Sequence, residues 1–177
     1  MMTTEQSMAP SAALTLPALA DRAVRLLQLA TPLTFVQLVT RVALAVPFWR
    51  SGILKWEGFL KLSDTAVTLF TDEFMLHLPG GPYPFPLPKL MAFMSGCGEV
   101  AFPVLLILGL GTRFAALGLL FMTCIVELTV PDGWPIHLTW AAMALTLIAH
   151  GAGRLSLDHV LGTLFGGAHQ GSASRGM

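Results

Sequence analysis

Four long, mostly apolar stretches mark out the chain, at about residues 33–54, 90–110, 114–130 and 134–150. A helix needs roughly 20 such residues to cross the hydrocarbon core of a bilayer. Only Gly111-Thr112-Arg113 and Pro131-Asp132-Gly133 separate the last three stretches, and connections this short make consecutive helices antiparallel. The pattern predicts an all-α integral membrane protein, folded as an antiparallel four-helix transmembrane bundle.

The segment between the first two stretches has a different pattern. Apolar residues recur there at helical spacing, at Phe59, Leu62, Ala66, Leu69, Phe70 and Phe74. Polar residues lie mostly on the opposite face, so we expect an interfacial amphipathic helix within residues 59–76. Alternating prolines follow over residues 79–88, which favours an extended, stiff connector.

Composition points to the same class of protein. Hydrophobic residues make up 54% of the 177 residues and charged residues only 11%, with a mean hydropathy of +0.71. A soluble domain carries about 25% charged residues. The ten basic residues are balanced by ten acidic ones, which excludes nucleic acid as a partner because binding its phosphates needs clustered Lys and Arg. The partner that the composition indicates is the lipid bilayer.

The basic residues also predict an orientation. If the N-terminus is cytoplasmic, five of them lie on the inner side and three on the outer side; the five are Arg22, Arg25, Arg113, Arg154 and Arg175. The positive-inside rule therefore favours a multi-pass protein with both termini in the cytoplasm. We expect a cytoplasmic N-terminal segment over residues 1–32, a four-span membrane domain over 33–162 and a flexible tail over 163–177. No basic region precedes the short apolar stretch 12–19, so we expect no signal peptide and a first span that is retained.

Several motifs together resemble the DoxX family. They are Arg41 followed by Gly52-Ile53-Leu54-Lys55, Glu99 with Pro103, Leu108-Gly109-Leu110-Gly111-Thr112-Arg113, and Gly151-Ala152-Gly153-Arg154-Leu155-Ser156-Leu157-Asp158. The resemblance covers about residues 36–162. It implies a bacterial or archaeal cytoplasmic (inner) membrane protein. The family includes DoxD, a subunit of a thiosulfate:quinone oxidoreductase, and proteins associated with oxidative stress and metal stress.

Ionisable residues inside the apolar stretches are the main candidates for a functional site, because charge at that depth is costly. Arg41 lies roughly 12 Å from the inner end of its span and Glu99 roughly 14 Å from the outer end of the next. Those depths nearly coincide, so we predict an Arg41–Glu99 ion pair. Lys55 and His137 are the alternative partners of Glu99. Pro103 frees the carbonyl of Glu99, and Pro47 that of Ala43, so helix kinks are expected beside the pair.

A second polar group is expected near the outer surface. Glu127 and His137 flank a tight turn and share a depth. Cys97 and Cys124 lie at matching depths nearby and complete a set of weak candidates for a metal site. No C-x-x-C or H-x-x-x-H pair is present, so we predict no metal site.

The sequence leaves three functions open. The first is a membrane subunit of a quinone-linked redox or stress system, with quinone as the ligand and a protein partner that carries the electrons. The second is a component of a small-molecule or metal transporter with Glu99 as a protonatable switch. The third is a non-catalytic anchor for a soluble partner. Catalysis, any other cofactor and homo-oligomerisation are left undecided.

Overall fold

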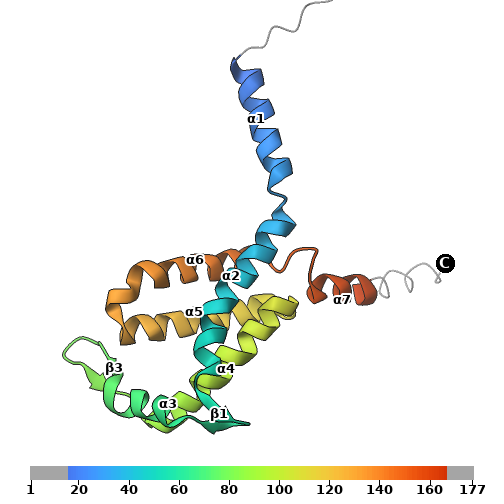
Figure 1. Cartoon of the computed structure of the whole chain (residues 1–177). Helices are drawn as coiled ribbons and strands as arrows, with labels where there is room; N and C mark the ends of the chain where they lie inside the picture. The colour runs from blue at the N-terminus through green and yellow to red at the C-terminus, as the bar shows by residue number, and fades with distance from the viewer. Residues whose placement is uncertain (1–15, 167–177) are drawn as a thin grey trace, which may run out of the picture. The chain divides into compact units, whose positions relative to one another are not determined.

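A computed structural model describes residues 16–166 of the protein. The chain divides at Pro32 into two compact units. The first contains one described helix, α1 (Leu16–Ala30), and the second contains every other described element (Figure 1). The expected N-terminal segment thus includes a helix of 15 residues.

The second unit contains four long helices: α2 (Leu33–Ile53), α4 (Pro88–Leu108), α5 (Thr112–Thr129) and α6 (Trp134–His150). They begin and end within two residues of the four expected apolar spans. α2 and α5 each contact both α4 and α6. Their shared core is fully apolar and includes Leu44, Phe48, Leu106, Leu119 and Leu147.

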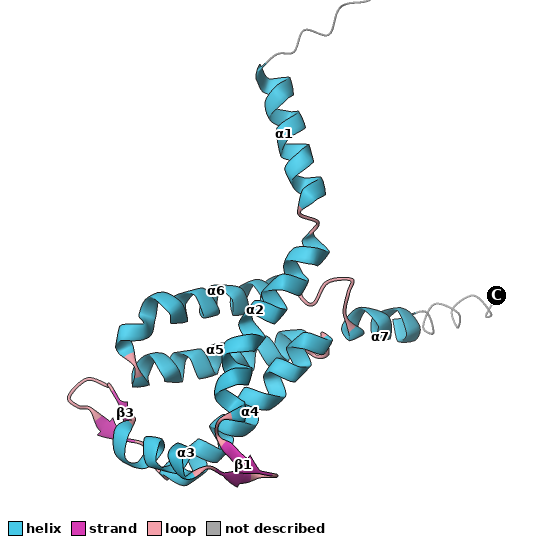
Figure 2. Cartoon of the chain, in the orientation of Figure 1, coloured by secondary structure: helices cyan, strands magenta, loops and turns pink. Residues whose placement is uncertain are grey.

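The described chain is mostly helical and has only two very small sheets (Figure 2). Within it, α4 and α5 are long and apolar enough to cross a membrane. A third span is present if α1 and α2 count as one broken span. The all-α membrane class predicted from the sequence is therefore confirmed.

The segment between α2 and α4 differs from its prediction. It forms β1 (Trp56–Gly58), β2 (Lys61–Leu62), α3 (Asp64–Thr68), the π-helix η1 (Leu69–Glu73), β3 (Met75–Leu76) and β4 (Tyr83–Pro84). Helical structure does lie within the expected range 59–76, but only over residues 64–73, as α3 followed by η1; residues 59–63 and 74–76 are not helical. Leu60 takes a positive φ of 55° between the antiparallel strands β1 and β2. Helix α3 can begin only after Ser63, whose hydroxyl accepts a hydrogen bond from the Ala66 amide at 3.2 Å.

The two remaining elements are short. The 3₁₀ turn η2 (Pro131–Gly133) joins α5 to α6, and α7 (Leu157–Gly166) follows α6. α7 extends four residues past the expected end of the membrane domain at residue 162. Residues 167–177 of the expected tail lie outside the described part of the chain.

Close packing at two glycines fixes how α2 lies against α4. A Cβ at Gly52 would lie 2.9 Å from the backbone of Glu99, so the two helices touch there without a side chain between them. At the other end of α4, Gly109 lies directly against the Arg41 guanidinium and has a φ of +67°. The two contacts show that α2 and α4 run antiparallel.

We therefore expect Gly52→Ala to destabilise the protein, by about 1–3 kcal/mol, because the added methyl group meets the rigid backbone of α4. Thermal unfolding in detergent measures the change. Gly162→Ala in α7 is the matched control, since a Cβ there meets no atom within 4 Å. Equal melting temperatures for the two variants would contradict the close contact.

Candidate functional site

The predicted Arg41–Glu99 ion pair does not form. The contacts of Gly52 with Glu99 and of Arg41 with Gly109 place Arg41 ten residues away from Glu99 along α4. That offset is about 15 Å at the rise of an α-helix. The prediction aligned the ends of the two spans, whereas α4 is shifted along α2 toward the end where Gly52 lies. Its N-terminal half packs instead against the α2–α4 segment, with Gly96 against Trp56 and Ala92 in one apolar cluster with Phe70 and Phe85.

Glu99 pairs instead with Lys55, the alternative partner named from the sequence. Its carboxylate lies 2.5 Å from the Lys55 ammonium and accepts a second hydrogen bond from the Ser95 hydroxyl at 2.9 Å. The Lys55 ammonium also donates to the Ser51 hydroxyl at 3.0 Å. The side chains of Lys55 and Glu99 are only 13% and 6% exposed. We call these four residues the Lys55–Glu99 cluster.

Sequence reasoning missed the two serines of this cluster, although a signal was present. Ser51 precedes Lys55 by four residues, and Ser95 precedes Glu99 by four. Residues four apart are neighbours on one helix face. A hydroxyl one turn before each charged residue therefore indicates that the charge can be hydrogen-bonded by a side chain of its own helix.

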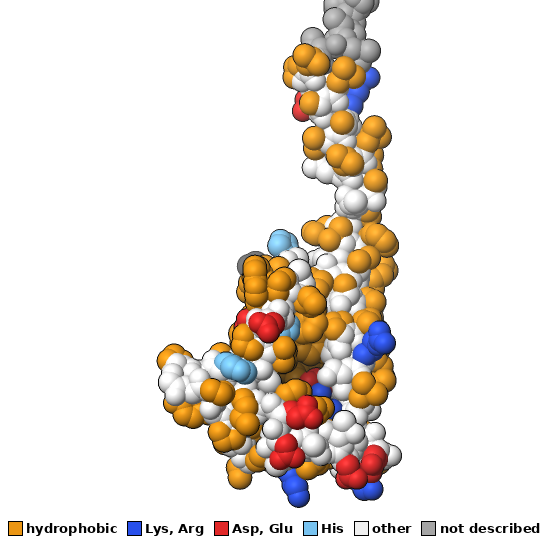
Figure 3. All heavy atoms as spheres, turned by 60° about the vertical axis from the view of Figure 1, so that its left-hand side comes forward, with side chains coloured by type: hydrophobic (Ala, Val, Ile, Leu, Met, Phe, Trp, Pro, Cys, Tyr) orange, Lys and Arg blue, Asp and Glu red, His pale blue; other side chains and the backbone are white. Residues whose placement is uncertain are grey.

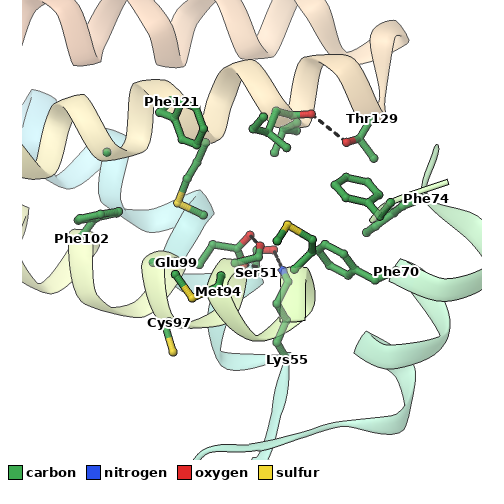
Figure 4. A pocket seen from close by; sticks show the side chains of 18 of the residues that line it. Ser51, Lys55, Phe70, Phe74, Met94, Cys97, Glu99, Phe102, Phe121 and Thr129 are labelled. Atoms are coloured by element: carbon green, nitrogen blue, oxygen red, sulfur yellow. Dashed lines mark hydrogen bonds and ion pairs between the residues drawn. The ribbon is translucent and has the colours of Figure 1, made fainter. Parts of the chain in front are cut away.

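The cluster borders a cavity of about 620 Å³ between α4, α5 and the η1 region. Figure 4 shows Glu99, Ser51 and Lys55 on one side of this space, with Phe102 and Phe121 at one end and Phe70 and Phe74 at the other. Most of the remaining lining is apolar and rich in methionine, with Met91, Met94 and Met122. The site is an apolar chamber with one polar wall.

The chamber opens sideways, between α4 and α5. Met94 of α4 and Phe121 of α5 both line it, yet they are 59% and 67% exposed. In the space-filling view, the side chains around a hollow in the protein surface are largely hydrophobic (Figure 3). A side opening with apolar edges suits a ligand that arrives from the lipid phase.

Arg41 has a separate position at the opposite end of α4. It is fully buried, and its guanidinium donates to the Leu155 carbonyl at 2.5 Å. Asp158 holds the neighbouring turn, because its carboxylate accepts hydrogen bonds from the amides of Gly111 and Thr112 at 2.7 and 3.0 Å. The 108–113 and 151–158 motifs therefore meet beside Arg41. A carboxylate at these amides also suits the N-terminus of α5 electrostatically.

Of the second polar group predicted from the sequence, only Glu127 and His137 come into contact. The His137 ring lies 2.7 Å from the Glu127 carboxylate and 5.1 Å, centroid to centroid, from Trp140. Cys97 lines the chamber, whereas Cys124 is exposed and does not. Within residues 16–166, no three His, Cys, Asp or Glu side chains are arranged to hold a metal ion.

Both predicted kink positions lie inside continuous helices, Pro47 in α2 and Pro103 in α4. Pro103 has no N–H to donate to the Glu99 carbonyl, and the carbonyl carbon and oxygen are among the Glu99 atoms that lie nearest to Gly52. The proline therefore frees an acceptor directly behind the Lys55–Glu99 cluster.

Comparisons with known proteins agree on a family. The DoxX family model matches residues 36–132. An uncharacterized protein of Haemophilus influenzae is 32% identical over 135 residues, which cover 70% of this chain and 82% of that protein. No solved structure matches the chain. The chain belongs to the DoxX family and is a membrane protein.

The Lys55–Glu99 pair generates a prediction about stability. Removing one partner leaves the other charge buried and unpaired, which typically costs about 3–5 kcal/mol. We expect Lys55→Met and Glu99→Gln each to lower the free energy of unfolding, and the double variant to lose less than the two effects combined. A double-mutant cycle on thermal or denaturant unfolding measures that coupling.

The matched control is the same cycle with Arg41→Met and Glu99→Gln. These two sites are far apart, so their effects should add within about 0.5 kcal/mol. Coupling between Arg41 and Glu99, with none between Lys55 and Glu99, would restore the pairing first predicted from the sequence.

Proposed function

We propose that the protein crosses the cytoplasmic membrane four times, with both termini inside, and binds a quinone in the chamber beside Lys55 and Glu99. It would then serve as the membrane subunit of a quinone-linked redox or stress system. The observation that carries this proposal is an apolar chamber, open toward the lipid, with a buried cationic donor in its wall. A quinone needs those two features, since it combines an apolar body with carbonyl acceptors.

Lys55 is the residue that would recognise the quinone head group. An ammonium has three N–H donors, and Glu99 and Ser51 use two of them. The third can donate to a quinone carbonyl, while Glu99 keeps the lysine charge balanced in an apolar setting. Phe70 and Phe74 line the same chamber and offer ring faces and edges to a planar head group.

The proposed role requires a protein partner. Lys, Ser and Glu side chains bind and orient a quinone and handle its protons, but they do not carry electrons. A second subunit with a redox group would deliver or accept them. Homo-oligomerisation is compatible with this role and is not needed for it.

A transporter with Glu99 as a protonatable switch is the second candidate. Its support is local, because protonating Glu99 would remove the ion pair with Lys55 at the edge of the chamber. The third candidate, a non-catalytic anchor, does not use the chamber. Quinone binding uses both the apolar lining and the charged wall, so we favour it.

The proposed topology is tested by labelling single cysteines in sealed, right-side-out vesicles. In a Cys97→Ala/Cys124→Ala background, Lys61→Cys should react with a membrane-impermeant thiol reagent and Arg154→Cys should not. Both residues are exposed and each change removes one positive charge, so the variants are matched. The reverse pattern would overturn the orientation.

Quinone binding is tested with a short-chain ubiquinone or menaquinone analogue and the purified protein in detergent. We expect the analogue to raise the melting temperature of the unmodified protein. Lys55→Met/Glu99→Gln should bind about tenfold more weakly or worse, since it loses a charged hydrogen bond without leaving a lone buried charge. Lys89→Met is the control, because Lys89 does not line the chamber. Unchanged affinity in the double variant, or no binding to the unmodified protein, would refute the proposal.

A further inference from the structure

Helix α1 is amphipathic along its whole length, and none of its residues is buried. At 100° per residue, eight of its eleven apolar side chains occupy an arc of about 160° without a polar residue in it, and the other three, Pro17, Ala18 and Leu29, lie outside the arc. The arc consists of Leu16, Leu19, Ala20, Ala23, Val24, Leu26, Leu27 and Ala30. Asp21, Arg22, Arg25 and Gln28 lie on the opposite side.

The leucines of this arc are well exposed: Leu16 is 84%, Leu26 67% and Leu27 66% accessible. A helix with one wide apolar face is stable only when that face is covered. Nothing within α1 covers this face, so the covering surface must lie outside the helix.

Chain connectivity identifies that surface. Only Thr31 and Pro32 separate α1 from α2, so the end of α1 lies within about 11 Å of the start of α2. Large exposed apolar side chains begin at once on α2, with Leu33 59% and Phe35 54% accessible. The end of α1 is therefore held where α2 meets the lipid.

Length argues against α1 as part of the span itself. The 21 residues of α2 extend about 31 Å, which matches the hydrocarbon core of about 30 Å. By length alone, α2 can therefore cross it without α1. The polar side of α1, with Arg22 and Arg25, would also be expensive in hydrocarbon and is suited to lipid phosphates.

We propose that α1 lies flat in the lipid interface on the side where α2 begins, with its apolar arc in the acyl chains and its arginines at the head groups. The protein thereby gains a lipid-binding element outside its four-helix unit. This inference rests on the proposed membrane crossing of α2, and the experiment below tests the two separately.

The experiment places a nitroxide label on single cysteines of the full chain, in the Cys97→Ala/Cys124→Ala background. The protein is reconstituted in vesicles of phosphatidylethanolamine and phosphatidylglycerol. Labels at Leu19, Ala23 and Leu27 report the apolar arc, and labels at Ala18 and Gln28 report the polar side. Collisions with oxygen, which partitions into lipid, are compared with collisions with an aqueous nickel chelate.

We expect the three arc positions to be exposed to oxygen and shielded from the nickel chelate, and the two polar-side positions to show the reverse. Oxygen exposure at all five would mean that α1 continues the span, and nickel exposure at all five that it is free in water. Shielding of the arc from both reagents would mean that a protein surface covers it, whether the second unit of this chain, a second copy or a partner. Each of these three outcomes overturns the proposal.

Two controls sharpen the result. A label at Val42, an exposed position on α2, should meet oxygen; if it does not, the membrane crossing fails rather than the inference about α1. Leu27→Gln should raise the nickel accessibility of a label at Ala23 severalfold. Leu29→Gln makes the same chemical change on the polar side, two residues away, and should leave that label unchanged.

Discussion

The close contact of α2 with α4 at Gly52 and Glu99 is the constraint on which the site depends. Gly52 lets the backbone of α2 touch that of α4, and Lys55, one turn further on, then reaches the Glu99 carboxylate. A bulkier residue at position 52 would push the helices apart and separate the two charges. The steric contact and the ion pair thus favour the same register of α2 along α4. In other registers the helix backbones could not approach as closely, and a buried charge would be left unpaired at a high cost in free energy.

A second fixed point at the far end of α4 completes the register. Gly109 gives room to the Arg41 guanidinium, and Arg41 in turn bonds the Leu155 carbonyl beyond α6. Asp158 ties that same segment to the first amides of α5. The glycine-rich motifs that pointed to the family therefore have a structural reason, since they let three chain segments meet around one buried arginine. As a result, Arg41 and Asp158 lie together at one end of α4, whereas Lys55 and Glu99 lie at the chamber.

Helix positions could be predicted from the sequence, whereas helix register could not. Apolar run length sets where α2, α4, α5 and α6 begin and end, because a span must match the bilayer. Register depends on which small residues face each other, and run length says nothing about that. Aligning the span ends paired Arg41 with Glu99, although Gly52 and Gly109 carried the information that decides the pairing. The hairpin at residues 56–62 was missed for a similar reason, since the positive φ of Leu60 leaves no trace in a hydrophobic pattern.

The same register explains why a chamber exists at all. α4 meets α5 at the tight Gly109–Gly111 turn and is held against α2 at Glu99, and the chamber lies between the N-terminal half of α4 and the C-terminal half of α5. Near the turn the gap is filled, with Phe102 of α4 packed on Gly118 of α5. Further out, aromatic side chains of the α2–α4 segment, Phe70 and Phe85, cover the end of the space without filling it. An unfilled apolar volume costs packing energy in any protein, but one that opens to lipid can be occupied by an apolar molecule. The charged wall then decides which molecule is held, because only a ligand with an acceptor satisfies the remaining donor of Lys55.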